Sequence, residues 1–220
     1  PNSVAQMYRP EKNDPYKKVT HQEFFEKARA IGLGLDAIGL KRGDKVGFIA
    51  DVGPVWLPVS MGITTVGGVD VPRGTDATQQ ELLYIFKHAD CPIIILDNEK
   101  VFNSISGNLA DFTNLKTIIF VNAAKPQVPP HIKVYALDEI IASGKSVHAA
   151  QPNRYAELGN AVGEEDLVTI IYTSGTTGNP KGVMHSNKSL TWEISHVGDG
   201  INFKPNGVTM GFLPPWHVAE

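Results

Sequence analysis

The expected fold of this chain turns on one stretch, Asp166-Leu167-Val168-Thr169-Ile170-Ile171-Tyr172-Thr173-Ser174-Gly175-Thr176-Thr177-Gly178-Asn179-Pro180-Lys181-Gly182. It opens with short, mostly β-branched apolar residues, which predict a buried strand that begins a sheet. After Tyr172 the apolar residues end, and the next five residues are all Thr, Ser or Gly. The stretch therefore predicts a strand that runs directly into a polar, glycine-rich turn.

The composition of this turn suits a polyphosphate. Its three glycines let the backbone take positive φ and approach a ligand closely, and successive amide groups in such a turn form a nest that binds anions. Neutral hydroxyl donors come from Thr173, Ser174, Thr176 and Thr177. Lys181 adds a point charge, and Pro180 stiffens the end of the loop, which lowers the entropy lost on ordering it. The turn is therefore interpreted as a phosphate-binding loop.

Two other interpretations of the turn are weaker. A Walker A loop needs a second glycine five positions after the first, but counting from Gly175 this position is Pro180. A P-loop NTPase is therefore disfavoured, and ATP hydrolysis without a carboxylate would test it. A flexible linker rich in Gly, Ser and Thr does not usually carry Pro-Lys-Gly behind a β-branched strand.

Upstream of the turn, short apolar strands alternate with amphipathic helices. Strands are expected at residues 45–50, 68–71, 92–96, 115–121 and 132–136, and helices at 20–39, 55–66, 78–88 and 98–111. This alternation predicts an α/β protein with parallel sheets flanked by helices. Residues 143–163 are rich in Ser, Gly, Asn and Ala and suggest a linker to a second sheet. The expected division is a first α/β subdomain at 1–163 and the start of a second at 164–220.

Composition narrows the class of protein. Apolar residues make up 42 % of the chain, which suffices for a core, and the net charge of −3 does not favour a nucleic-acid partner. The apolar runs are too short to span a bilayer, and no secretory leader precedes the first helix. Cys91 is the single cysteine, so an internal disulfide is excluded. The expected location is the cytoplasm.

Residues 172–182 resemble the signature loop of the AMP-forming acyl-adenylating superfamily, without a gap. A second motif, Gly211-Phe212-Leu213-Pro214-Pro215-Trp216-His217-Val218-Ala219-Glu220, resembles the aromatic-His motif that follows in that family. Its ending in His-x-x-Glu looks most like long-chain fatty acyl-CoA synthetases. The order of features from Thr20 to Val121 is also similar, so the resemblance covers nearly the whole chain.

The resemblance implies a ligase that uses Mg-ATP to turn a fatty acid into an acyl-adenylate and then transfers the acyl group to CoA. Phosphate contacts would come from Thr173, Ser174, Gly175, Thr176, Thr177, Gly178 and Lys181. Thr173 would help to position Mg²⁺, His217 would act in catalysis, and Trp216 and His217 would lie at the acyl-adenylate pocket. The implied partners are fatty acid, ATP and CoA.

The other parts of that family's machinery lie downstream of the aromatic-His motif. They comprise a Glu for Mg²⁺, an Asp for the ribose and a small C-terminal domain with the main catalytic Lys, none of which this chain contains. The chain is therefore expected to be an N-terminal portion that is inactive alone. An aryl- or aminoacyl-adenylating enzyme, or a non-catalytic nucleotide-binding module, remains an alternative. Peripheral membrane contact would suit long-chain substrates, although no amphipathic basic helix indicates it.

Other features favour structural roles. The Gly32-Leu33-Gly34 stretch matches a relaxed dinucleotide fingerprint, but it lies within a helix rather than after a strand, which favours helix packing. Cys91 is expected to be buried and unreactive. Asp70 and Asp97 are expected to end strands and to cap turns.

Overall fold

The computed structural model describes residues 3–122, 125–173, 179–200 and 207–208, and it confirms the α/β class. The strands are β1 (Val4–Tyr8), β2 (Lys17–Thr20), β3 (Lys45–Ile49), β4 (Val69–Arg73), β5 (Ile93–Leu96), β6 (Thr117–Phe120), β7 (Lys133–Ala136), β8 (Leu167–Thr173) and β9 (Lys181–Ser186). The helices are α1 (His21–Ala37), α2 (Trp56–Thr65), α3 (Gln79–Ala89), α4 (Glu99–Ile105), α5 (Leu137–Ala150), α6 (Arg154–Asn160) and α7 (Asn187–Gly200), with a 3₁₀ helix at Ser106–Asp111.

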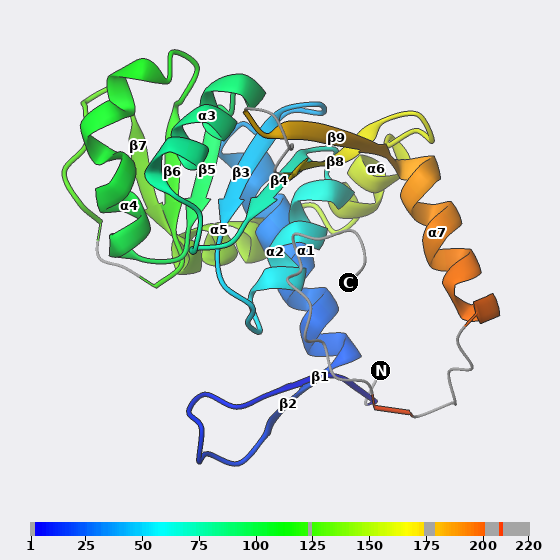
Figure 1. Ribbon diagram of the computed structural model, residues 1–220. Helices are drawn as coiled ribbons and strands as arrows, with labels where there is room; N and C mark the ends of the chain where they lie inside the picture. The colour runs from blue at the N-terminus through cyan, green and yellow to red at the C-terminus, as the bar shows by residue number, and fades with distance from the viewer. Residues whose placement is uncertain (1–2, 123–124, 174–178, 201–206, 209–220) are drawn as a thin grey trace.

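A seven-stranded sheet organises these elements in the order β7-β6-β5-β3-β4-β8-β9 (Figure 1). Strands β3 to β8 run parallel, and β9 returns antiparallel to β8. Strand β4 lies on one side of β3. The chain then crosses to the other side of β3, where β5, β6 and β7 follow in order. This reversal is the doubly wound pattern, in which ligands bind outside the carboxyl ends of the strands.

Helices cover both faces of the sheet because consecutive strand residues point to opposite sides. Phe48 belongs to the hydrophobic cluster formed with α1, α2 and α5, whereas the next residue, Ile49, packs in the cluster formed with α3 and α4. β5 alternates in the same way. Burial on both faces explains why these strands are continuous apolar runs.

Local signals place the helix ends where the sequence predicts them. Thr20 with Glu23 and Thr78 with Glu81 form complete capping boxes at the starts of α1 and α3. Gly39 follows α1 with φ of 101°, a left-handed conformation that ends helices and favours glycine. The packing role of the glycines inside α1 is also confirmed. A Cβ on Gly32 would lie 2.8 Å from the Gly62 carbonyl oxygen of α2.

Two expectations about the segment before β8 are wrong. Residues 143–163 are not a linker, because they contain the second half of α5 and all of α6. Strand β8 does not open a separate sheet, because it pairs with β4. Two arginine–carboxylate contacts fasten the segment: Arg154 binds Asp36 of α1 at 2.9 and 3.0 Å, and Arg42 binds Asp166 at 2.6 Å. A division into subdomains at 163/164 stays a prediction.

Three further elements were not predicted. The polar N-terminal stretch forms the antiparallel hairpin β1–β2, and Lys181–Ser186 and Asn187–Gly200 form β9 and α7. Within the described part of the chain, no helix is long and apolar enough to cross a membrane.

Candidate phosphate-binding site

The two strands that flank the glycine-rich stretch, β8 and β9, pair with each other. Thr173 is the last residue of β8 and Lys181 is the first residue of β9, and the two are directly opposite each other in the antiparallel register. Both are exposed. Since β8 is parallel to β4, Thr173 lies at the carboxyl end of the parallel strands, which is the edge where doubly wound sheets bind ligands.

Lys181 is the cation available beside the turn. In the described residues it has no ion-pair partner. Arg73, at the same edge of the neighbouring strand β4, instead lies 3.6 Å from a carboxylate oxygen of Asp76 and 3.6 Å from one of Glu81. Positive charge for an anionic ligand is therefore expected from Lys181 and not from Arg73.

A buried phenol fixes the end of β8. Tyr172 points to the face covered by α3, and its hydroxyl lies 2.7 Å from Nδ1 of His88. Tyr84, one turn earlier on α3, stacks on His88 and meets the Tyr172 ring edge-on. Burial raises the pKa of Tyr172 to about 12, so the phenol stays protonated beside Nδ1 of His88. The residue before Thr173 is therefore hydrogen-bonded to α3.

Gly182 has a different role from the one expected. Its φ is not positive, so backbone freedom does not explain it. Instead, Gly182 lies opposite Tyr172, and a Cβ there would stand 2.9 Å from Cγ2 of Ile170 and 3.2 Å from Cζ of Tyr172. The glycine leaves room for the phenol ring to cover the neighbouring strand. It therefore sets the spacing of the two strands that hold the turn.

The remaining predicted site residues fall outside the described part of the chain. They are Ser174, Gly175, Thr176, Thr177, Gly178, Trp216 and His217. The described residues include no group of three or more His, Cys, Asp or Glu side chains that would hold a metal by themselves. An exposed hydroxyl at Thr173 and an uncommitted ammonium at Lys181 suit a nucleotide polyphosphate and the Mg²⁺ it carries, which needs few protein ligands.

Other expected roles are partly revised. Asp97 follows β5 as expected, but it accepts a 2.7 Å hydrogen bond from Asn122 beyond the neighbouring strand β6, so this bond joins two strand ends and does not cap a local turn. Asp70 does not end a strand: it lies inside β4, fully buried, and accepts a 2.6 Å hydrogen bond from Ser60 of α2. Burial raises the pKa of Asp70 to about 7. Cys91 is buried as expected, and burial raises the pKa of its thiol to about 12.

His88 was missed at the level of sequence. It is 84 positions away from Tyr172, and nothing in the local pattern of α3 connects the two. Only the arrangement of the sheet, with β4 between β3 and β8, brings α3 over the end of β8. The sequence offers only a weak indication of this contact, namely a His in the last turn of an amphipathic helix.

A doubly wound sheet, with a glycine- and threonine-rich sequence between two strands that pair at its carboxyl edge, is typical of α/β proteins that bind nucleotide phosphates. Residues 1–220 match the AMP-binding enzyme family throughout, and the chain belongs to that family.

Curated relatives support this assignment. A long-chain-fatty-acid–[acyl-carrier-protein] ligase of Arabidopsis thaliana, AEE15, is 31 % identical over 214 residues, which are 94 % of this chain and 29 % of the relative. The long-chain-fatty-acid–CoA ligase ACSBG1 of Rattus norvegicus is 25 % identical over 212 residues, again 94 % of this chain and 29 % of the relative. The chain thus spans less than a third of the length of these relatives.

Solved structures share the fold. The N-terminal domain of FACL13 from Mycobacterium tuberculosis superposes with a TM-score of 0.70 at 23 % identity, over 92 % of this chain and 46 % of that domain. The anthranilate CoA ligase AuaEII superposes with a TM-score of 0.65 at 20 % identity, over 83 % of this chain and 32 % of that one. At these identities the likeness concerns the fold alone.

Proposed function

We propose that the protein to which this chain belongs is an ATP-dependent fatty acid–CoA ligase. A carboxylate oxygen of the fatty acid attacks the α-phosphorus of ATP, the bond to the β-phosphate oxygen breaks, and pyrophosphate leaves. The CoA thiolate then attacks the acyl carbon, and AMP leaves with the electron pair of the acyl–oxygen bond. The observation that carries the proposal is the pairing of Thr173 with Lys181 across a glycine-rich turn at the carboxyl edge of the sheet.

The roles of the residues follow from this placement. Thr173 to Gly178 and Lys181 would bind the β- and γ-phosphates and stabilise the charge that develops on pyrophosphate as it leaves. The Thr173 hydroxyl would help to position Mg²⁺. Trp216 and His217 would line the pocket for the acyl-adenylate, with His217 near the reacting carboxylate.

The preference for fatty acids rests on the curated relatives, which are long-chain-fatty-acid ligases. Their names differ in the thiol that receives the acyl group, CoA in one and acyl carrier protein in the other. A solved structure with the same fold is an anthranilate CoA ligase, so aromatic acids are the main competing substrate class. The experiment therefore varies both the acid and the thiol.

The test is ATP–pyrophosphate exchange by the undivided natural gene product with acids from acetate to palmitate, and with benzoate and amino acids as controls. Exchange should peak with fatty acids and fall at least about 100-fold in Lys181→Ala, since a preorganised charge in such a site contributes about 3 kcal/mol. Lys133→Ala is the matched control, because Lys133 is also an exposed lysine that begins a strand. Exchange that peaks with benzoate or an amino acid, or none with any acid, would refute the proposal.

The same assay run on residues 1–220 alone should give no turnover, because the relatives are more than three times as long. Adding CoA or acyl carrier protein to the complete protein identifies the acceptor by which thioester forms. We place the protein in the cytoplasm with peripheral membrane contact, and cell fractionation with a salt wash tests that location.

A further inference from the structure

Asp70 places a carboxyl group inside the sheet, and one of its two oxygens has no partner. The residue is 2 % exposed, and Oδ2 accepts a 2.6 Å hydrogen bond from Oγ of Ser60 in α2. Oδ1 is buried and has no hydrogen-bond partner in the described residues. A buried oxygen that lacks a partner is costly, and a negative charge on it costs more. The fold therefore favours the protonated form of this carboxyl group.

The groups that surround Asp70 do not compensate a negative charge. Helix α2, which covers it, contains no ionisable side chain. The residues paired with Asp70 are Val46 of β3 and Thr169 of β8, and Thr169 is paired in turn with His185 of β9. Nε2 of His185 is buried without a partner, so it makes no bond to the acid. Burial raises the pKa of Cys91, before β5, to about 12, so its thiol is neutral.

Two cations of neighbouring segments are also not available to Asp70. Lys45 precedes Val46 on β3, so its side chain begins on the opposite face of the sheet. Arg42 lies 2.6 Å from a carboxylate oxygen of Asp166. Burial raises the pKa of Asp70 to about 7, and no charged side chain of the described residues contributes to this shift.

Asp70 lies where the strand that leads into the glycine-rich stretch joins the sheet (Figure 1). Five register pairs join β3 to β4, whereas one, between Asp70 and Thr169, joins β4 to β8 in the part of the chain that the structure describes. Six pairs join β8 to β9, so these two strands form one unit. Side-chain contacts of Asp166 and Tyr172 hold the two ends of β8. The middle of β8 therefore depends on the pair at Asp70.

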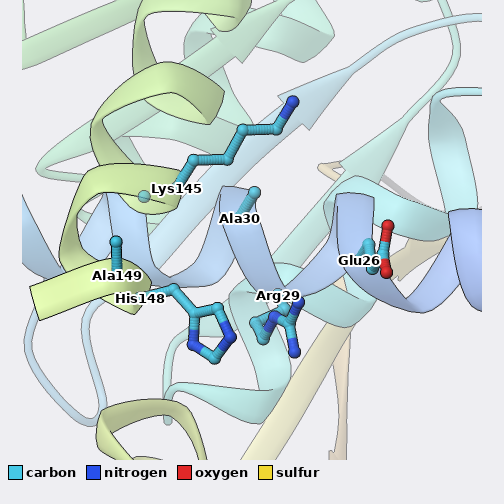
Figure 2. Close-up of a pocket in the computed structure, with 7 residues that line it drawn as sticks. Glu26, Arg29, Ala30, Lys145, His148 and Ala149 are labelled. Carbon is cyan, nitrogen blue, oxygen red and sulfur yellow. The ribbon is translucent and has the colours of Figure 1, made fainter. Parts of the chain in front are cut away.

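The helix above Asp70 is held more firmly than β8. A Cβ on Gly62 of α2 would stand 2.9 Å from the carbonyl oxygen of Ala28 in α1. Helix α1 is fixed in turn by α5, since a Cβ on Gly144 would fall on the carbonyl oxygen of Ala30. Figure 2 shows Ala30 on α1 beside the part of α5 that carries Lys145. When the surroundings of Asp70 open, β8 is therefore expected to move and α2 is not.

We propose that the proton on Asp70 keeps β8 attached to β4, and that loss of this proton lets the middle of β8 separate from the sheet. Ionisation leaves a buried charge without compensation, and separation of the strands admits water to it. The closed form holds the proton more tightly than the open form, because water restores the ordinary pKa of 3.8. Opening is therefore rarest below about pH 4, increases as the pH rises, and levels off above about pH 7.

The test is hydrogen–deuterium exchange of the undivided protein without ATP between pH 5 and pH 8, corrected for the intrinsic effect of pH on amide exchange. Relative to peptides from β6, protection of peptides from β8 should fall at least about tenfold from pH 5 to pH 8. Asp70→Asn, which cannot ionise, should show no such fall. A consequence for ATP, weaker binding as the pH rises, rests on the proposed function. The exchange result does not, because no ATP is present.

Two further variants identify the titrating group. Ser60→Ala removes the hydrogen bond that lowers the pKa of Asp70, so the fall should extend to higher pH before it levels off. His185→Gln removes the other titratable side chain in line with Asp70 and should leave the fall unchanged. Equal loss of protection in β6 and β8 would indicate global unfolding and overturn the proposal. A fall that persists in Asp70→Asn, or that disappears in His185→Gln, would overturn it as well.

Discussion

The hydroxyl of Tyr172 and Nδ1 of His88 lie 2.7 Å apart, and this hydrogen bond joins α3 to the strand that leads into the glycine-rich turn. Through this bond, the end of β8 beside the candidate phosphate site is attached to a helix that packs on the sheet. Thr173 follows Tyr172 directly, so this hydrogen bond lies one residue away from the first hydroxyl of the glycine-rich stretch.

Tyr172→Phe should lower the free energy of unfolding by about 1 kcal/mol, because it removes the partly buried hydrogen bond between the phenol and His88. In the complete protein it should also raise the KM for ATP. Urea unfolding and steady-state kinetics measure the two effects. Tyr16→Phe, which removes a hydroxyl from an exposed ring, should change neither. An unaltered unfolding midpoint in Tyr172→Phe would show that the hydrogen bond is not stabilising.

Gly182→Ala should destabilise the protein by about 1–3 kcal/mol, since the new methyl group meets Cγ2 of Ile170 at 2.9 Å. Shortening the neighbour should relieve the overlap. In the double variant Gly182→Ala/Ile170→Ala, in which Cγ2 is absent, the loss should be smaller than the sum of the two single losses. A purely additive result in the double-mutant cycle would rule out this contact as the reason for glycine.

Asp70 should make stability depend on pH. Its carboxyl has an ordinary pKa of 3.8 and a pKa of about 7 in the folded chain, so the folded state holds the proton more tightly than the unfolded state. The stabilising contribution of the protonated acid is therefore complete below about pH 4 and is lost as the pH rises to about 7. Asp70→Asn keeps an acceptor for Ser60 without the charge.

The Asn variant should therefore be more stable than the parent at pH 8 and should differ less from it at pH 5. Thermal unfolding across this range measures the difference. Asp14→Asn, at an exposed position, supplies the comparison for a surface charge. A constant difference between Asp70→Asn and the parent at all pH values would contradict a raised pKa.

Cys91 should resist thiol reagents in the native protein. Its thiol is buried, and a pKa of about 12 leaves little thiolate at neutral pH. Labelling with a disulfide reagent at pH 8 should be at least about 100-fold slower than in urea, in line with exposure only by unfolding. Fast labelling of the folded protein would show that β5 opens locally.

Gly144→Ala should reduce stability by about 3 kcal/mol, because its methyl group would displace the carbonyl oxygen of Ala30 and force α1 away from α5. Gly107→Ala offers a matched control: a Cβ at Gly107 has no atom within 4 Å. This control should be neutral or slightly stabilising. Chemical unfolding measures both effects. If the two substitutions lower the free energy of unfolding equally, the close contact between α1 and α5 does not explain the need for glycine at position 144.

Much of the sheet was predictable because its signals are local. The apolar runs around Phe48 and Ile94, and the capping boxes at Thr20 and Thr78, report burial and helix starts from neighbouring residues alone. The buried strand that precedes the glycine-rich stretch, β8, was predictable for the same reason. These signals do not depend on which strands pair.

What escaped prediction depends on distant partners or on weak patterns. Strand β9 is at the edge of the sheet and leaves Met184 66 % exposed, so its sequence lacks the alternation that marks a half-buried strand. The segment before β8 was interpreted as a linker because Ser and Gly are frequent there, yet Gly144 is required by the contact with α1. In the candidate site, the partner of Tyr172 and the crowding at Gly182 exist only after β8 joins β4.

The pairing of β4 with β8 also sets an order of events during synthesis. Asp70 and Thr169 are partners although about 100 residues separate them, so β4 leaves the ribosome long before its neighbour exists. Until β8 is made, the edge of β4 that will pair with it has unpaired backbone N–H and C=O groups. These groups can pair with strands of other chains. A nascent chain that pauses before Asp166 would therefore hold β3, β5, β6 and β7 in place while the strand that carries the turn is still missing.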